Sequence, residues 1–175
     1  MREYIPYRSL DPRVLWPLGR RYPEFLLKEV MPFVESEYQV ATGPDNTGLG
    51  GSSLGGLITL YTLMVEAGVF GMALVESPSI FVAKRRILAD SRKFHDWPFR
   101  IYLGVGTREL GDPAKDQVIV NDVRELAKIL NSSGVPGSRL KVLIEEGASH
   151  GEKAWGDRFP AALEFLFGAG GNSQT

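Results

Sequence analysis

The sequence predicts an α/β fold: a three-layer α/β/α sandwich around a mainly parallel sheet. Two observations lead to this prediction. Strand-like and helix-like segments alternate along the chain, and the strand-like segments are continuous apolar runs rather than alternations of apolar and polar residues. Such runs are typical of parallel strands that helices cover on both faces. With 175 residues and no internal repeat, we expect a single domain over residues 1–168 and a flexible tail over 169–175.

Four short apolar segments are the expected strands. They cover residues 47–52, 70–76, 100–105 and 140–144. Each leads into a stretch that contains glycine, serine or an acidic residue, as loops at strand ends commonly do. In an open parallel sheet these loops meet at one edge, where functional residues collect.

Five helices are expected from apolar residues that recur at three- and four-residue spacing. They cover residues 22–35, 54–67, 80–91, 116–130 and about 152–167. The clearest is the fourth, in which Val123, Leu126 and Leu130 share one face. The first 21 residues show no clear periodicity, and we expect them to form an irregular arm.

Two of these helices contain a proline. Pro32 is expected to kink the first helix or to end it early, and Pro160 to disturb the last one. The residues expected to face the core are Phe25, Leu26, Val30 and Phe33 in the first helix, and Trp155, Phe159, Leu163 and Leu166 in the last.

The composition excludes several functional classes. The formal net charge is −1 and 23% of the residues are charged, so no basic surface indicates nucleic acid or an anionic membrane as a partner. The chain has no cysteine, which rules out disulfides, thiolate metal sites and a cysteine nucleophile. No apolar run reaches membrane-spanning length, and the first residues lack the apolar core of a secretory signal. We therefore expect a soluble, cytoplasmic protein.

Residues 48–61 contain the motif to which the other candidate residues are related. This stretch contains the pattern Gly51-x-Ser53-x-Gly55, in which a strand ends, turns sharply and starts a helix with a serine at the turn. Because the flanking chains pass close together, we expect that only glycine fits two residues on either side of Ser53. The first turn of the helix directs free N–H groups at this serine, which favours a developing oxyanion. The simpler alternative is a turn of small residues that lets a helix pack on a sheet.

The other expected strand ends add the remaining groups of a nucleophilic site. In chain order they present Ser53, the segment 77–79, the acidic residues Glu109 and Asp112, and His150. Nucleophile, acid and histidine follow one another in this order in one large class of serine hydrolases. A serine hydroxyl needs a base to remove its proton, and an imidazole does this near neutral pH. A carboxylate then holds the imidazole in the correct tautomer.

Each candidate has an alternative role. Glu109 is the first choice for the acid, Asp112 is the alternative acid, and Glu76 is the third choice. Asp112 would equally well cap the helix that follows it. Trp155 is expected to be part of the core or of a pocket wall, and the second histidine, His95, to lie on the surface. A nucleotide-binding loop is disfavoured, because no lysine follows the glycines as it does in a P-loop.

Four motifs support a more specific comparison. They are residues 51–56 (Gly-Ser-Ser-Leu-Gly-Gly), 77–79 (Ser-Pro-Ser), 106–111 (Gly-Thr-Arg-Glu-Leu-Gly) and 149–155 (Ser-His-Gly-x-x-x-Trp). Together they resemble the "putative esterase" branch of the α/β hydrolases, which includes enterochelin, feruloyl and acetyl-xylan esterases, S-formylglutathione hydrolases and mycolyltransferases. Residues 2–7 and 25–33 also resemble sequences of this branch, so the resemblance covers nearly the whole chain.

This resemblance implies an α/β-hydrolase fold and a serine carboxylesterase activity. The expected reaction is hydrolysis of short-chain or aryl carboxylic esters through an acyl-enzyme, without a metal or organic cofactor. The family pattern makes Ser53 the nucleophile, His150 the base and Glu109 the preferred acid.

The resemblance also implies an oxyanion site, to which the backbone N–H of Leu54 contributes, with Ser52 and Trp155 beside it. Family members normally carry several strands before the N-terminal arm, and a loop after one of them supplies a second N–H. Here the chain begins at Met1, just before the arm. Losing one oxyanion donor typically costs on the order of 100- to 1,000-fold in rate. We therefore expect a weakened minimal esterase or one that obtains its second donor elsewhere; the alternative is an inactive binding or assembly module.

Without those strands, the strand before Ser53 would lie at the edge of a truncated α/β-hydrolase sheet. An exposed apolar edge is prone to association. We therefore expect the N-terminal arm to cover it or a second chain to pair with it, the latter giving a homodimer or a higher homo-oligomer. The other expected partner is a small-molecule ester substrate.

Overall fold

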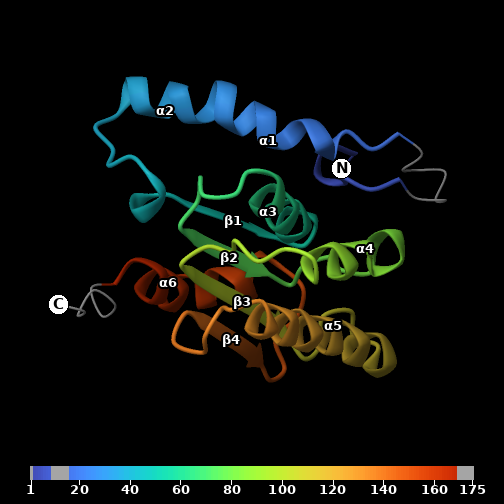
Figure 1. Ribbon diagram of the computed structural model, residues 1–175. Helices are drawn as coiled ribbons and strands as arrows, with labels where there is room; N and C mark the ends of the chain where they lie inside the picture. Colours follow the sequence, from blue (N-terminus) through green and yellow to red (C-terminus); the bar gives the residue numbers. More distant parts are fainter. Residues whose placement is uncertain (1, 9–15, 169–175) are drawn as a thin grey trace.

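The computed structural model describes residues 2–8 and 16–168 (Figure 1). The expected flexible tail, residues 169–175, and part of the expected arm lie outside the described residues. The strands are β1 (Gly48–Ser52), β2 (Met72–Glu76), β3 (Arg100–Gly106) and β4 (Leu140–Glu145). The helices are α1 (Tyr22–Phe25), α2 (Met31–Glu37), α3 (Leu54–Val65), α4 (Val82–Ser91), α5 (Pro113–Ser132) and α6 (Glu152–Phe167).

The four strands are parallel and follow one another in the order β1-β2-β3-β4. In the register, Ser52 lies opposite Glu76, Glu76 opposite Gly104, and Gly106 opposite Glu145. The carboxyl ends of all four strands therefore form one row. The expected α/β fold is confirmed, and the strand bounds differ from the predicted ones by one or two residues.

Helices cover both faces of the sheet. Because crossovers between parallel strands share one hand, α3, α4 and α5 lie together on one face, and α6 packs on the other face against β2 and β3 (Figure 1). The side chains of β2 alternate accordingly. Ala73 and Val75 belong to the larger core under α3, α4 and α5, whereas Met72 belongs to the smaller core under α6. The three-layer arrangement expected from the continuous apolar strands is thus present.

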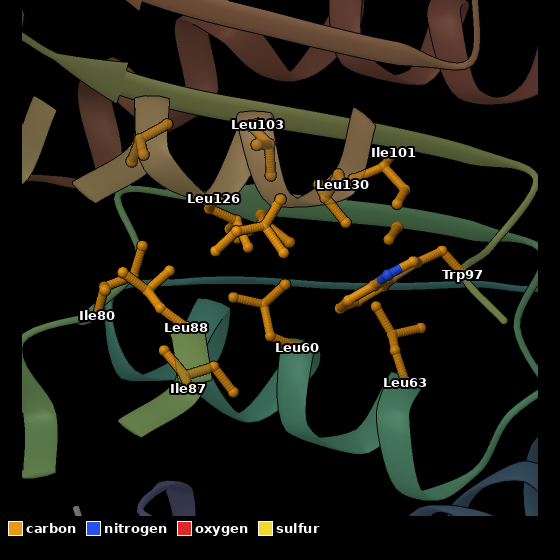
Figure 2. Packing of buried hydrophobic residues seen from close by; sticks show 14 of the residues in the cluster. Leu60, Leu63, Ile80, Ile87, Leu88, Trp97, Ile101, Leu103, Leu126 and Leu130 are labelled. Carbon is orange, nitrogen blue, oxygen red and sulfur yellow. The ribbon is translucent and has the colours of Figure 1, made fainter. Parts of the chain in front are cut away.

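The larger core contains mainly leucine and isoleucine from the helices and from β3. Figure 2 shows Leu60 of α3, Leu126 of α5 and Leu103 of β3 within this core, with Leu60 and Leu126 pointing toward one another. All three side chains are fully buried. The expected inward face of α5 is confirmed.

The N-terminal helical segment corrects two expectations. It continues past Pro32 to Glu37, because a π-helical turn (Leu26–Val30) precedes the proline and lets Met31 N–H donate to the Leu26 carbonyl. Its expected inward face is wrong for Phe25 and Phe33, which are 46% and 61% exposed, whereas Leu26 and Val30 are half-buried. Helix α1 packs on α3, Leu27 and Met31 pack against the larger core, and the rest of α2 extends away from α3 (Figure 1).

The start of α4 also differs from the expected helix. Ala83, Lys84 and Arg85 have φ angles of 50°, 58° and 63°, so they form a left-handed turn before the regular helix begins. At the end of this turn, the Arg85 guanidinium forms an ion pair with the buried Asp122 of α5. This ion pair joins the turn to the neighbouring helix.

Helix α6 extends beyond the edge of the sheet that β1 forms. It continues through Pro160, and of the residues expected to face inward only Leu166 is buried, while Phe159 is 46% exposed and Leu163 is exposed as well. The reason is that β1 is the edge strand, so nothing among the described residues fills the space beside it. An open groove of about 550 Å³ lies there, lined mainly by glycines of β1 and by apolar side chains of β2 and α6.

The outer edge of β1 is unpaired within the described residues. Ser53 N–H donates to the Glu76 carbonyl of the neighbouring segment at 2.9 Å. Since successive residues of a strand alternate, Gly48, Gly50 and Ser52 direct their N–H and C=O groups toward the open edge. The described part of the arm packs on α3 and does not pair with β1, so its expected covering of the edge is not observed there.

No helix in the described ranges combines the length and the apolar character that crossing a bilayer requires.

Candidate active site

Ser53 lies at a sharp turn between β1 and α3. Its backbone has a φ of 56° and a ψ of −119°, which non-glycine residues rarely adopt. Two backbone hydrogen bonds hold this conformation. Ser53 N–H donates to the Glu76 carbonyl at 2.9 Å, and Ser79 N–H donates to the Ser53 carbonyl at 3.0 Å. The strand and loop next to the turn therefore fix a strained residue in place.

The two glycines that flank Ser53 differ in what they permit. A Cβ on Gly51 would lie 2.5 Å from the carbonyl carbon of Gly55, so the strand and the helix approach too closely for a side chain at Gly51. A Cβ on Gly55 would meet nothing within 4 Å. The expectation that only glycine fits is therefore confirmed for Gly51 and wrong for Gly55, where the space is open.

Backbone hydrogen bonds join the loops that follow β3 and β4. Arg108 N–H donates to the Ala148 carbonyl at 3.0 Å, and His150 N–H donates to the Glu109 carbonyl at 3.3 Å. Gly106 permits this approach, because a Cβ there would overlap the Ala148 carbonyl oxygen. These contacts bring Glu109 and His150, which lie 41 residues apart, to the same place.

The side chain of Glu109 is completely buried and accepts hydrogen bonds on both oxygens. Its Oε2 lies 2.5 Å from His150 Nδ1, and its Oε1 accepts from the Ser77 hydroxyl at 2.7 Å and from Gly106 N–H at 2.6 Å. Burial by itself would raise the pKa of Glu109, but the hydrogen bonds from His150, Ser77 and Gly106 outweigh it, so this pKa lies below the ordinary glutamate value. The ionised carboxylate occupies Nδ1 of the imidazole and leaves Nε2 for another partner.

Two acidic residues close to Glu109 in the sequence, among them the alternative acid Asp112, have different roles. Asp112 caps α5: its Oδ1 accepts from Ala114 N–H at 3.1 Å and from Lys115 N–H at 3.3 Å. Asp116, in the first turn of the same helix, is buried and accepts from Leu110 N–H at 2.6 Å. Neither carboxylate hydrogen-bonds to a histidine. Both instead fix the loop that carries Glu109.

Ser53 is not hydrogen-bonded to His150 in the described part of the chain. Its Oγ lies 3.3 Å from the Oγ of Ser79, a long distance for a hydrogen bond between hydroxyls. The imidazole of His150 remains partly accessible, with 29% of its side chain exposed. The second histidine, His95, lies on the surface as expected.

The three residues expected beside Ser53 lie on three elements: Ser52 ends β1, Leu54 begins α3 and Trp155 belongs to α6. Leu54 is the first residue of α3, so its N–H has no partner within the helix. Ser52 and Trp155 both line the groove between β1 and α6. The ring of Trp155 also meets that of His150 edge to face, with 5.0 Å between the ring centroids. Trp155 thus forms part of the wall of this groove, as expected, and it also contacts His150, a candidate catalytic side chain.

A buried ion-pair network fixes α6 to the strand ends. Arg158 Nε and Nη2 donate to Oε2 of Glu76 at 3.0 and 2.7 Å, and Nη1 donates to Glu145 at 2.6 Å. Gly104 makes room for the Glu76 carboxylate, because a Cβ there would overlap it. Burial raises the pKa of Glu76, although Arg158 opposes this effect. Glu76, the third candidate acid, is therefore a structural partner of Arg158.

Sequence reasoning did not assign roles to Ser77, Ser79, Glu145 and Arg158. The first two stand directly after an expected strand, which placed them at the correct edge but did not identify their partners. Arg158 resembled any charged residue of an amphipathic helix, since its partners come from strands far away in the sequence. Across the described residues, no group of three or more histidine, aspartate or glutamate side chains could hold a metal ion.

Removing Arg158 is expected to destabilise the fold strongly. Arg158→Met would leave the buried Glu76 carboxylate without its counter-charge, at a cost of about 3–5 kcal/mol in the free energy of unfolding. Urea denaturation measures this. The double variant Arg158→Met, Glu76→Gln is the control and should recover most of the loss, because it removes both charges. A single variant as stable as wild type would contradict the importance of this ion pair.

The lowered pKa of Glu109 predicts an acid-dependent contribution to stability. Since the folded-state pKa lies below that of the unfolded chain, Glu109 stabilises the fold above about pH 4.3 and loses this contribution as the pH falls through the folded-state value. The stability difference between wild type and Glu109→Gln should therefore be largest near neutral pH and shrink in acid. Denaturation curves at several pH values test this, and a difference that is independent of pH would oppose it.

Comparisons with known proteins indicate the family to which the chain belongs. A family model named Esterase, with the description "Putative esterase", matches residues 17–166. The uncharacterized protein YbbA of Bacillus subtilis is 24% identical over 177 residues, which cover 93% of this chain and 71% of that protein.

Two solved structures are similar in fold. The BES protein from Bacillus cereus superposes with a TM-score of 0.73 at 22% identity over 93% of this chain and 61% of its own. The siderophore hydrolase EstB from Aspergillus nidulans superposes with a TM-score of 0.71 at 19% identity over 87% of this chain and 60% of its own. The chain thus spans less than two thirds of either solved protein. Because the family model matches most of its length, the chain belongs to the Esterase family.

Proposed function

We propose that this protein is a serine carboxylesterase in which Ser53 is the nucleophile, His150 the general base and Glu109 the acid that orients His150. The observation that carries the proposal is the hydrogen bond between the buried Glu109 and His150, which lies at the same sheet edge as the strained turn at Ser53. Family membership supports the reaction class. The pair supplies the base that a serine hydroxyl needs.

The proposed reaction has two steps. Ser53 Oγ attacks the ester carbonyl carbon while its proton passes to Nε2 of His150, and the Glu109 carboxylate stabilises the resulting imidazolium. The imidazolium then protonates the leaving alcohol as the C–O bond breaks, which leaves an acyl group on Ser53. In the second step, the same imidazole deprotonates a water molecule, which attacks the acyl carbon. The imidazolium then returns this proton to Ser53 Oγ as the acyl C–O bond breaks, which releases the acid and the free serine.

For the first step, the Ser53 side chain must turn from Ser79 toward His150. The cost is small, because the 3.3 Å distance between the two hydroxyl oxygens makes a weak hydrogen bond. The N–H of Leu54 would bind the oxyanion at the start of α3.

We propose short-chain or aryl carboxylic esters as substrates. One of the solved relatives is a siderophore hydrolase, so ester-linked siderophores form a second substrate class to assay. We further propose that the unpaired edge of β1 pairs with a second copy of the chain. The absence of cysteine is compatible with a cytoplasmic location, which we also propose.

Replacing either proposed reactive residue should abolish ester hydrolysis. Ser53→Ala and His150→Ala are each expected to lower kcat/KM for p-nitrophenyl acetate and butyrate by at least about 1,000-fold, because removing one member disables the unit. His95→Ala is the matched control, since it removes the other histidine, and it should retain wild-type activity. Undiminished hydrolysis by folded Ser53→Ala would refute the proposal, and inactive wild type would favour a binding or assembly module.

A charge at the open edge should prevent the proposed pairing. Gly48→Lys adds a charged side chain to the edge strand on the face covered by α6, where its Cβ would lie 3.1 Å from the end of the exposed Phe167 side chain, and it is expected to convert the dimer to a monomer. Val118→Lys, on the exposed side of α5, is the control and should leave the dimer intact. Light scattering after size-exclusion chromatography gives the mass in each case. Monomeric wild type at micromolar concentration would contradict the pairing.

A further inference from the structure

We propose that Ser77 and Trp155 are positioning residues: together they orient the Glu109 carboxylate and, through it, the His150 imidazole. This inference rests on the proposed serine-esterase function. It assigns roles to two side chains that do not take part in the bond-making steps.

The direction of the Ser77 hydroxyl is determined by its two partners. The indole Nε1–H of Trp155 donates to Ser77 Oγ at 3.1 Å, and Ser77 Oγ lies 2.7 Å from Glu109 Oε1. An indole N–H can only donate, and a hydroxyl carries a single proton. The proton of Ser77 therefore points at Glu109, and Trp155 keeps it there. Ser77 is 2% exposed, so water does not compete for this proton.

The backbone of Ser77 is also held in an unusual conformation. Its φ is 42°, in the left-handed region that non-glycine residues rarely occupy. Ser77 N–H donates to the Gly104 carbonyl at 2.7 Å, which fixes this residue at the end of β2. A strained residue that persists beside a candidate catalytic carboxylate is consistent with a positioning role.

Trp155 contacts the same network at two points. Its N–H binds Ser77, and its ring meets the His150 ring edge to face at 83°. Three residues later on α6, Arg158 is paired with Glu76 and Glu145, which anchors this part of the helix to the strand ends. These contacts form a closed cycle, which connects Trp155 to Ser77, Ser77 to Glu109, Glu109 to His150 and His150 back to Trp155.

This cycle of contacts predicts how the loss of the Ser77 hydroxyl would affect Glu109 and the activity. Glu109 Oε1 would keep only the N–H of Gly106, and the carboxylate would be held less firmly against His150. We expect Ser77→Ala to lower kcat/KM roughly tenfold, the scale of one hydrogen bond to a charged group. Because one of the interactions that stabilise the ionised carboxylate is lost, the pKa of Glu109 should rise.

The test follows the titration of the Glu109 carboxyl carbon by NMR in protein labelled with 13C-glutamate, with the signal assigned by Glu109→Gln. Ser77→Ala and Ser77→Gly both remove the hydroxyl, but they fit a φ of 42° differently. A rise of the pKa in both variants therefore indicates the hydroxyl rather than backbone strain. Trp155→Phe keeps an aromatic ring beside His150 and removes only the N–H, so it should give a smaller rise.

Two matched controls come from the core. Trp97→Phe removes another indole hydrogen bond of 3.1 Å, to the Phe94 carbonyl, and Ser91→Ala removes another buried hydroxyl. Neither should change the titration of Glu109. An unchanged titration in the Ser77 variants and in Trp155→Phe, or an equal change in the controls, would overturn the proposal.

The outcome is independent of the proposed activity, because the titration needs no substrate. If wild type hydrolyses no ester, the serine-esterase function fails while the titration still decides whether Ser77 and Trp155 act on Glu109. If Ser53→Ala loses activity but neither kcat/KM nor the titration responds in Ser77→Ala, the function stands and the positioning role falls.

Discussion

The parallel register of the four strands is the constraint on which the site depends. Ser52, Glu76 and Gly104 lie opposite one another across β1, β2 and β3, and Gly106 lies opposite Glu145 of β4. The segments that follow the strands are therefore neighbours without long loops to bring them together. Glycine at the points of closest contact lets these segments touch through their backbones.

Two buried carboxylates at this edge differ because their surroundings differ. Glu109 accepts hydrogen bonds from an imidazole, a hydroxyl and a backbone N–H, and its pKa falls below the ordinary value. The burial of Glu76 outweighs the effect of Arg158, and its pKa rises. The first carboxylate contacts a histidine that is partly open to solvent, and the second joins α6 to the sheet. Environment, rather than residue type, separates the candidate catalytic acid from the structural one.

Much of the fold could be predicted from the sequence, because apolar periodicity reports directly on burial. The strands, the inward face of α5 and the strand–turn–helix at Ser53 are all found in the structure. The exposure of Phe33 and Phe159 could not be predicted, because the pattern identifies an apolar face but does not show whether a neighbouring element covers it.

For the candidate site, the sequence predicted which strand end each residue follows but not the contacts between the residues. The order of the expected strands predicted that Ser53, Glu109 and His150 lie at one edge of the sheet. For Asp112 the sequence allowed two roles, catalytic acid or helix cap, and in the structure it is the helix cap. The contacts around Ser77 could not be inferred, since they depend on a positive φ and on a helix that arrives 78 residues later. Tertiary hydrogen bonds of this kind leave no local pattern in the sequence.

The most direct test of the central claim is labelling of the native protein with a fluorophosphonate, followed by peptide mass spectrometry. A serine activated by a histidine should carry one adduct, on the peptide that contains Ser53. His150→Ala should lose this adduct while it keeps its fold, and His95→Ala should retain it. No adduct on folded wild type, or an adduct on Ser79 instead of Ser53, would contradict the assignment of Ser53 as the nucleophile.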